Sequence, residues 1–391
     1  MSPLDVYLVP GFLGFDVVGE APYFVDVPAA LAASPPLADR ELAVHPVGIE
    51  PAGSLARRAA CVAEQVARTH RPGATVHFVG HSTGGLDVRL LLSPGSGVER
   101  RLAYDLRPAC ETAVAATCSA ISLATPHLGT PAADVFQRAG GDVLLRALGY
   151  LAQAPVTSEI LLAVIRTVGP ALAAIARVSP HDAFLQWMVA SFLGGDPRSV
   201  VSYLGRLRAD QGATMHLGVA VADTLDALLV DRPGVRYRSF CTAPPPPAPM
   251  APVLHAEPGQ DDPIIVLNSQ LYRVLWLVVG AGDARFPLPE ASGDALRACV
   301  DSLSAADRAA IGPVDLSREA NDGIVPTWSQ VHGEVGGVVA SDHLDCVGMY
   351  PHRDGADRWV SGWVRSGAEF RDDRFRWLWG RIAAAIAADA A

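Results

Sequence analysis

The sequence contains no lysine, so arginine supplies all 31 of its basic side chains. Only 18% of the residues are charged, and the formal net charge is -10 at pH 7. A chain with this excess of acidic groups is repelled by phosphate backbones and by anionic lipid headgroups. We therefore expect no nucleic-acid partner, no anionic membrane partner and a neutral substrate.

The sequence also lacks a C-x-x-C pair among its six cysteines, which argues against a zinc ribbon or a dithiol redox site. Its two long apolar runs, 160–178 and 264–280, are interrupted by Arg166 and Arg273 among other polar residues, so neither predicts stable insertion into a bilayer. The first predicted strand, 4–9, leaves no room before it for a signal peptide. These features predict a cytoplasmic protein, or a secreted one whose leader has been removed.

Half of the 391 residues are hydrophobic, which suffices for a large core. Short apolar segments alternate with helical patterns, and this alternation predicts a parallel sheet flanked by helices. Helices are expected over 55–69 and over 370–388, the latter as a closing helix whose tryptophans lie in the core. The predicted strands are 4–9, 42–45, 76–79, 118–124 and 235–241.

The most informative stretch is 76–85, where an apolar strand leads directly into Gly80-His81-Ser82-Thr83-Gly84. A Gly-x-Ser-x-Gly sequence between a strand and a helix is typical of a nucleophile elbow, in which the serine lies on a sharp, strained turn. The glycines two residues before and after the serine leave room for the chain to fold back. This pattern predicts that Ser82 is a nucleophile, and an ordinary glycine-rich turn is the alternative.

An activated serine needs donors that stabilise the negative charge on the attacked oxygen. In an elbow of this kind, the amide of the residue after the nucleophile is one donor, and a loop after an early strand supplies the second. Here these positions are Thr83 and Phe12, the latter within the segment 10–16 that follows the first strand. We therefore predict an oxyanion hole formed by the amides of Phe12 and Thr83.

The serine also needs a general base and an acid that orients this base. Asp322 lies in a turn-forming segment, and His343 follows a short apolar run. The order Ser, Asp, His along the chain is that of hydrolase-type elbows. We predict Ser82, Asp322 and His343 as a catalytic triad. Among the other histidines, His127 and His332 are the alternatives for the base.

Together these motifs resemble those of the bacterial true lipases and related esterases of the α/β-hydrolase fold. The resemblance implies a mostly parallel central sheet flanked by helices, with a large helical cap or lid. It also implies the activity of a serine esterase or lipase. The segments that carry the resemblance are 10–14, 80–85, 125–130, 321–326 and 343–345.

In many of these lipases, an aspartate two residues after the histidine binds a structural calcium ion together with another acidic side chain. Asp345 has that position in this sequence, and Asp301, which precedes the acid turn, is the candidate second ligand. Calcium is a hard cation that takes six or more oxygen ligands. The resemblance thus implies calcium as a structural ion and no cofactor for the reaction itself.

Residues 131–232 show apolar helical patterns and no predicted strand. In open α/β sheets, ligands bind at the carboxyl ends of the strands, so a helical block inserted between strands is expected to cover the site there. We predict a cap or lid over 131–232, and a bundle that serves stability alone is the alternative. Candidate residues for an acyl pocket in this cap are Leu144, Leu148, Trp187 and Met188.

Residues 1–130 and 233–391 are predicted to form the hydrolase core, with a second helical insertion at about 243–318. We expect the protein to cleave neutral small-molecule or lipid esters through an acyl-enzyme on Ser82, with a preference for medium-chain acyl groups. Polyesters undergo the same chemistry. The alternatives are an acyltransferase of the same fold and a non-catalytic binding protein of this fold, and the oligomeric state stays open.

Overall fold

The computed structural model describes residues 2–12, 17–18, 21–50, 53–138, 212–247, 263–280, 288–355, 359–360 and 365–390. Its central sheet has the strand order β4-β1-β5-β6-β7-β8, and every neighbouring pair is parallel. These strands are β1 (Leu4–Val9), β4 (Leu42–Pro46), β5 (Thr75–His81), β6 (Thr117–Leu123), β7 (Arg236–Thr242) and β8 (Glu334–Val339). Two short antiparallel pairs are β2 (Val17–Val18) with β3 (Ala21–Pro22), and β9 (His352–Arg353) with β10 (Trp359–Val360).

The predicted parallel sheet is confirmed, and the predicted strands are present with small differences at their ends. Strand β8 is longer than the short apolar run that precedes His343 in the sequence. It begins with Glu334 and contains Gly336 and Gly337, so its first half has no apolar pattern. The beginning of this edge strand therefore could not be predicted from an apolar pattern.

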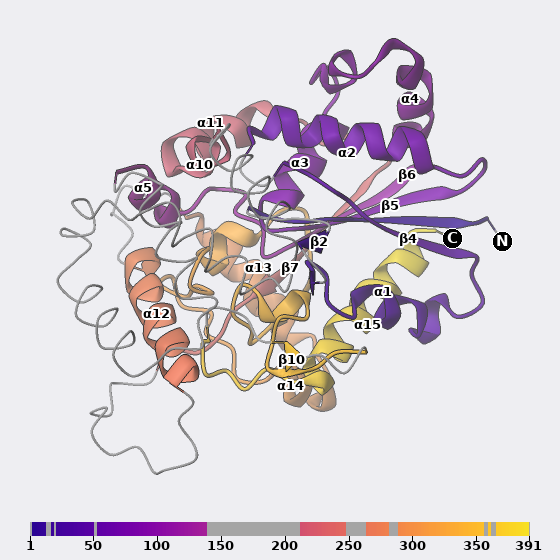
Figure 1. Ribbon diagram of the computed structural model, residues 1–391. Helices are drawn as coiled ribbons and strands as arrows, with labels where there is room; N and C mark the ends of the chain where they lie inside the picture. Colours follow the sequence, from indigo (N-terminus) through magenta and orange to yellow (C-terminus); the bar gives the residue numbers. More distant parts are fainter. Residues whose placement is uncertain are drawn as a thin grey trace, which may run out of the picture.

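Helices cover both faces of the sheet (Figure 1). Alternate side chains of β1 point to opposite faces, as expected for a strand. Tyr7 and Val9 pack with one helical layer, whereas Val6 and Leu8 pack with the other. The first layer contains α2 (Leu55–Thr69), α3 (Thr83–Leu92) and α4 (Arg107–Ala115), and the second contains α1 (Val27–Ala32) and α15 (Asp372–Asp389).

The closing helix α15 is confirmed, and it contacts the loop that contains His343. Trp379 is fully buried, and its indole Nε1 donates to the carbonyl oxygen of Cys346 at 2.9 Å. The expected core residues of α15 are all buried: Phe375, Leu378, Trp379, Ile382 and Ile386. Short 3-10 turns connect other elements: η1 (Pro35–Leu37), η2 (Val98–Arg101), η3 (Tyr104–Leu106), η6 (Thr327–Gln330) and η7 (Asp345–Val347).

Some of the described helices from the two predicted insertions lie together on the side of the molecule away from the N-terminus (Figure 1). Helix α5 contacts both α10 and α12, and α10 contacts α11. To this group the first insertion contributes α5 (Pro131–Arg138), α10 (Gly212–Leu217) and α11 (Val219–Leu228), and the second contributes α12 (Pro263–Gly280). The other described helices of the second insertion pack against β8 and α15. Within the ranges described above, no helix combines the length and apolar character needed to cross a bilayer.

The predicted second insertion also contains α13 (Glu290–Asp301) and α14 (Ala305–Ile311). Ser304 caps the second helix, because its hydroxyl oxygen accepts a hydrogen bond from the amide of Asp307 at 3.1 Å.

The domain boundaries at 131 and 232 stay predictions. The proposed acyl-pocket residues Leu144, Leu148, Trp187 and Met188 lie outside the described residues.

Candidate active site

The predicted nucleophile lies where β5 ends and α3 begins. Ser82 has φ 54° and ψ -129°, a backbone conformation that a non-glycine residue adopts only when its surroundings impose it. The amide of Ser82 donates to the carbonyl oxygen of Leu123 in β6 at 2.8 Å, so the turn is attached to the sheet. Strand, strained serine and helix thus follow each other as the sequence pattern predicts.

The glycines on both sides of Ser82 are required by close main-chain contacts. A Cβ atom at Gly84 would lie 2.2 Å from the carbonyl oxygen of Val9, and one at Gly80 would lie 2.5 Å from the amide nitrogen of Gly85. Main-chain atoms cannot yield as the end of a flexible side chain would. The sharp turn is therefore possible only with glycine at these two positions.

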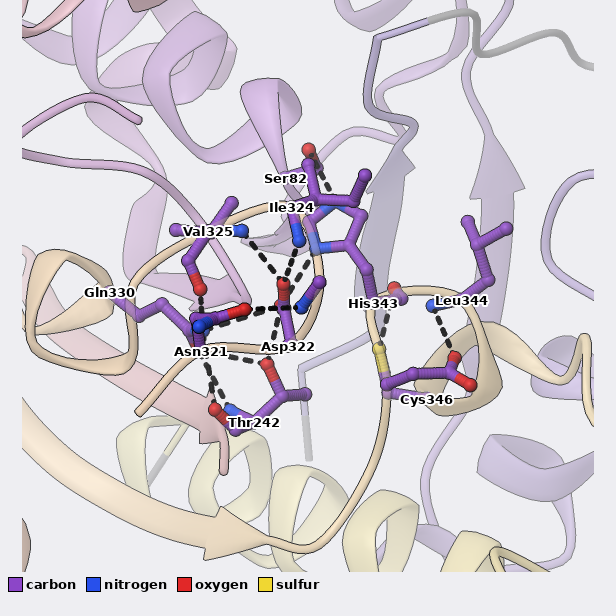
Figure 2. Close-up of polar contacts among 12 residues, drawn as sticks. Ser82, Thr242, Asn321, Asp322, Ile324, Val325, Gln330, His343, Leu344 and Cys346 are labelled. Atoms are coloured by element: carbon purple, nitrogen blue, oxygen red, sulfur yellow. Dashed lines mark hydrogen bonds and ion pairs between the residues drawn. The ribbon is translucent and has the colours of Figure 1, made fainter. Parts of the chain in front are cut away.

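The structure brings the three predicted triad residues into one line of contacts (Figure 2). His343 Nε2 lies 2.8 Å from Ser82 Oγ, and His343 Nδ1 lies 2.8 Å from Asp322 Oδ2. All three residues are at least 95% buried, with exposed fractions of 4% for Ser82, 0% for Asp322 and 5% for His343. They come from the end of β5, from the loop before η6 and from the loop after β8.

Five hydrogen-bond donors surround the carboxylate of Asp322 (Figure 2). Besides the histidine, Oδ2 accepts from Thr242 Oγ1 at 2.7 Å and from Gln330 Nε2 at 3.3 Å. Oδ1 accepts from the amides of Ile324 at 2.9 Å and Val325 at 2.8 Å. An environment made only of donors matches the ionised carboxylate, which can only accept.

This environment also determines where the hydrogens of His343 lie. Because Asp322 accepts, Nδ1 of His343 carries a hydrogen, and Nε2 of the neutral ring presents a lone pair to Ser82. The hydroxyl of Ser82 therefore donates to His343. This is the arrangement that a general base needs before it removes a proton.

The two alternative histidines have other partners. His127 Nδ1 lies 3.3 Å from Arg89 Nη1, and its Nε2 lies 3.0 Å from Ser122 Oγ. Burial is the main cause of a pKa of His127 well below its ordinary value, and the neighbouring charges act in the same direction. His332 Nε2 lies 3.0 Å from Asp231 Oδ1. Neither set of contacts includes the predicted nucleophile.

The loop after β1 passes directly over the nucleophile. A Cβ atom at Gly11 would lie 2.6 Å from Ser82 Cβ and 3.1 Å from Ser82 Oγ, so only glycine permits this approach. Arg58 Nη2 donates to the carbonyl oxygens of Pro10 at 2.8 Å and Gly11 at 3.2 Å. The described part of the chain has no cis peptide bond, and a trans peptide directs its C=O and N–H to opposite sides. The amide hydrogen of Phe12 therefore points away from Arg58.

The other predicted oxyanion donor, Thr83, is the first residue of α3 and is fully buried. Amides in the first turn of a helix lack partners within the helix, and the helix dipole makes this end positive. The side-chain hydroxyl of Thr83 also has no hydrogen-bond partner among the described residues. The roles of Phe12 and Thr83 as donors stay predictions.

Arg58, which binds the loop after β1, forms a fully buried ion pair with Asp87. Arg58 Nη2 lies 2.7 Å from Asp87 Oδ2, and Arg58 Nε donates to the same oxygen at 2.9 Å. Arg58 Nη1 donates to the carbonyl oxygen of Glu50 at 3.0 Å. Burial raises the pKa of Asp87 to about 6, and the guanidinium of Arg58 opposes this rise. Arg58 thus connects α2, α3 and the loop above the nucleophile.

The two predicted calcium ligands have different surroundings. Asp345 is buried, and burial followed by the neighbouring Asp342 raises the pKa of Asp345 well above its ordinary value. Asp301 at the end of α13 is 78% exposed and lies 3.8 Å from Arg308. Among the described residues, no group of three or more His, Cys, Asp or Glu side chains is arranged to hold a metal ion. These surroundings do not support Asp301 as a second ligand, and calcium at Asp345 stays a prediction that melting curves with and without chelator test.

Comparisons with known proteins give loose structural likenesses. No family model matches the sequence, and no curated protein matches it. Similar solved structures include a metagenomic carboxyl esterase, with 16% identity, 100% of this chain and 77% of that chain covered, and a TM-score of 0.46. EstA from Clostridium botulinum has 18% identity, 97% and 88% coverage and a TM-score of 0.47. Staphylococcus hyicus lipase has 16% identity, 92% coverage of each chain and a TM-score of 0.42.

The fold itself is evident from the parallel sheet, from the elbow between β5 and α3, and from the order Ser, Asp, His along the chain. The chain has the α/β-hydrolase fold. In this fold, the triad residues follow the carboxyl ends of strands and meet at one edge of the sheet. The contacts among Ser82, Asp322 and His343 occur at that edge.

Several residues of this candidate site were missed from the sequence. Thr242 ends β7 beside the acid turn, so a polar residue at a strand end was the available signal. Arg58 lies one turn before Val62 on the core face of α2, and a charge among apolar positions indicates a buried partner such as Asp87. Gln330 carries no such signal, because its contact with the acid depends on the turn η6.

We expect Arg58→Met to lower the free energy of unfolding by about 3–5 kcal/mol, because it leaves the carboxyl group of Asp87 buried without its ionic partner. The double variant Arg58→Met/Asp87→Leu should recover most of this loss, because an apolar pair of similar volume replaces the ions. Denaturant unfolding measures both. Arg308→Met, at an exposed position, is the matched control. Equal destabilisation of the single and double variants would show that the unpaired carboxyl group is not the cause.

Proposed function

We propose that this protein is a serine ester hydrolase, a carboxylesterase or lipase. The observation that carries the proposal is the continuous contact from Ser82 through His343 to Asp322, with two hydrogen bonds of 2.8 Å. A serine hydroxyl that can pass its proton to an oriented neutral imidazole is equipped to be an acylated nucleophile. The strained turn holds this hydroxyl at the edge of the sheet, where substrates of the fold bind.

In the first half of the proposed reaction, Ser82 Oγ attacks the ester carbonyl carbon while His343 Nε2 takes the hydroxyl proton. Asp322 stabilises the imidazolium through its hydrogen bond to Nδ1. The tetrahedral intermediate collapses, and the alcohol leaves with the proton from His343. The acyl group remains as an ester on Ser82.

In the second half, a water molecule attacks this ester. His343 takes a proton from the water, and the new tetrahedral intermediate releases the carboxylic acid as the proton returns to Ser82 Oγ. The enzyme ends each cycle in its starting protonation state.

Both intermediates carry a negative oxygen, for which we propose the amides of Phe12 and Thr83 as donors. Two features support this assignment. Arg58 holds the carbonyl oxygen of Gly11, so the N–H of Phe12 is directed away from the guanidinium. The amide of Thr83 lies at the positive end of α3. Donors that are already oriented need no rearrangement when the charge develops.

We propose neutral carboxylic esters with medium-chain acyl groups as substrates. The net charge of -10 disfavours anionic substrates. The predicted cap over 131–232 is apolar in sequence, and an apolar lining favours acyl chains because each buried methylene contributes about 0.8 kcal/mol. Polyesters present the same carbonyl group to the same nucleophile.

An acyltransferase is the second candidate, since it uses the same steps until an alcohol replaces water. Product analysis with added alcohol separates the two activities. A non-catalytic binding protein is disfavoured, because binding alone requires neither the strained Ser82 nor its contact with His343. Labelling with a fluorophosphonate tests this third interpretation directly.

We predict that Ser82→Ala and His343→Ala each lower kcat for a nitrophenyl ester by roughly 10⁴- to 10⁶-fold, the size seen when a triad member is removed. Fluorophosphonate labelling should disappear in Ser82→Ala. The control variants are Ser122→Ala and His127→Asn, which alter another buried Ser–His contact of 3.0 Å. They should keep the activity. Full turnover by Ser82→Ala would refute the mechanism.

We also predict that kcat/KM rises from acetyl to medium-chain nitrophenyl esters, by up to about fourfold for each added methylene that becomes buried. The measurement is a series of esters from acetyl to dodecanoyl on the purified protein. A steady fall of kcat/KM from the acetyl ester onward would contradict an apolar acyl pocket. It would leave the triad chemistry untouched.

A further inference from the structure

A chain of hydrogen bonds connects the loop above the nucleophile to the backbone of the proposed base. The amide of Gly11 donates to the hydroxyl oxygen of Tyr23 at 3.1 Å. This oxygen lies 2.6 Å from His81 Nδ1, and His81 Nε2 lies 2.8 Å from the carbonyl oxygen of His343. Tyr23, His81 and His343 are all buried.

The chemistry of these groups determines the direction of each hydrogen bond. The carbonyl of His343 can only accept, so Nε2 of His81 donates. Burial lowers the pKa of His81 well below its ordinary value, so its ring is neutral and Nδ1 accepts. Tyr23 therefore donates to His81, while its oxygen accepts from Gly11. Each hydrogen bond from Gly11 to His343 thus joins one donor to one acceptor.

At one end, this series of hydrogen bonds holds the backbone of His343. The amide of His343 donates to the carbonyl oxygen of Asp322 at 3.2 Å, and its carbonyl accepts from His81. His81 is bonded covalently to Ser82. The hydrogen bond from His81 thus ties the base to the residue next to the nucleophile, although Ser82 and His343 are 261 residues apart in sequence.

At the other end, this series of hydrogen bonds holds the predicted oxyanion loop. Tyr23 binds the N–H of Gly11, and Arg58 binds its C=O, so the residue before Phe12 is held from two directions. The fit is close, because a Cβ atom at Gly11 would lie 2.8 Å from the hydroxyl oxygen of Tyr23. A displacement of Tyr23 would therefore be transmitted to the peptide that presents the amide of Phe12.

We propose that Tyr23 and His81 are positioning residues, which set the placement of the base and the oxyanion loop relative to the nucleophile through this relay of hydrogen bonds. The inference rests on the proposed function, because it gives both residues the task of positioning the residues of that site. Tyr23 and His81 act through the backbones of Gly11 and His343. Proton transfer stays with Ser82 and His343.

Isosteric substitutions separate the two hydrogen bonds of His81. In His81→Gln, the amide nitrogen occupies the place of Nε2 and still donates to the carbonyl of His343. In His81→Asn, the shorter side chain reaches only the place of Nδ1, so the bond to His343 is lost. Tyr23→Phe removes a single oxygen and breaks the relay without changing the packed ring.

Matched controls come from the same part of the core. His77 is a fully buried histidine on the same strand, and it binds Ser119 rather than the site. Its variants His77→Gln and His77→Asn repeat the chemical changes made at His81. Tyr7→Phe is the control for Tyr23→Phe, because Tyr7 is a buried tyrosine of β1 whose hydroxyl contacts Thr69.

The experiment measures kcat and KM for a nitrophenyl ester, the rate of fluorophosphonate labelling of Ser82, and thermal unfolding. We expect kcat to fall by up to about 100-fold in His81→Asn and by about tenfold in Tyr23→Phe, as expected for misplaced reacting groups. His81→Gln should stay within about fivefold of the wild type, with KM in all three changed less than about threefold. Labelling rates should fall in parallel with kcat, while the control variants keep the wild-type rates.

Coupling between the two residues is the second readout. If one relay connects them, Tyr23→Phe/His81→Asn should lose little more activity than His81→Asn alone, because interacting residues are not additive. The relay is overturned if His81→Asn and Tyr23→Phe keep the wild-type labelling rate. It is also overturned if His81→Gln loses as much kcat as His81→Asn. Should His81→Asn fail to fold, Tyr23→Phe alone decides.

The outcome for the wild type separates this inference from the proposed function. A wild-type protein that neither hydrolyses esters nor reacts with the fluorophosphonate contradicts the hydrolase proposal itself. A reactive wild type with equally reactive Tyr23 and His81 variants contradicts the relay alone.

Discussion

Main-chain packing around Ser82 leaves almost no room for side chains, and the rest of the site is arranged around this restriction. The helix α3 lies so close to the end of β1 that a single methyl group at Gly84 would collide with the carbonyl of Val9. The loop after β1 then crosses the nucleophile at Gly11, again without space for a side chain. The end of β1, the loop that follows it and the start of α3 thus meet at the hydroxyl of Ser82.

Burying so many polar groups in one place is unfavourable unless each has a partner. Asp322 meets five donors, and the guanidinium of Arg58 meets a carboxylate and three carbonyl oxygens. These networks fix the positions of their members, since a displaced group would leave a buried donor or acceptor unsatisfied. The geometry of the site is therefore enforced by hydrogen bonding as well as by packing.

The sequence allowed the sheet, the elbow and the order of the triad to be predicted, because each depends on local pattern. A buried strand that ends in Gly-x-Ser-x-Gly predicts its own turn, and the acid and base follow from chain order. The partners Thr242 and Gln330 could not be found in this way. Their contacts with Asp322 depend on how β7 and η6 meet in space. The same holds for Tyr23, which reaches His81 from another segment of the chain.

The contact between Trp379 and the carbonyl of Cys346 relates the site to the order in which the chain is made. Ser82 and the strands β1, β4 and β5 leave the ribosome early, and domains fold from the N-terminus as synthesis proceeds. His343 is made 261 residues later, and the helix that packs against its loop is made later still. In a nascent chain, Ser82 therefore exists for a long time before the residue that its hydroxyl contacts. The hydrogen bond between Ser82 and His343 can form only after the chain has been made as far as β8 and the loop that follows it.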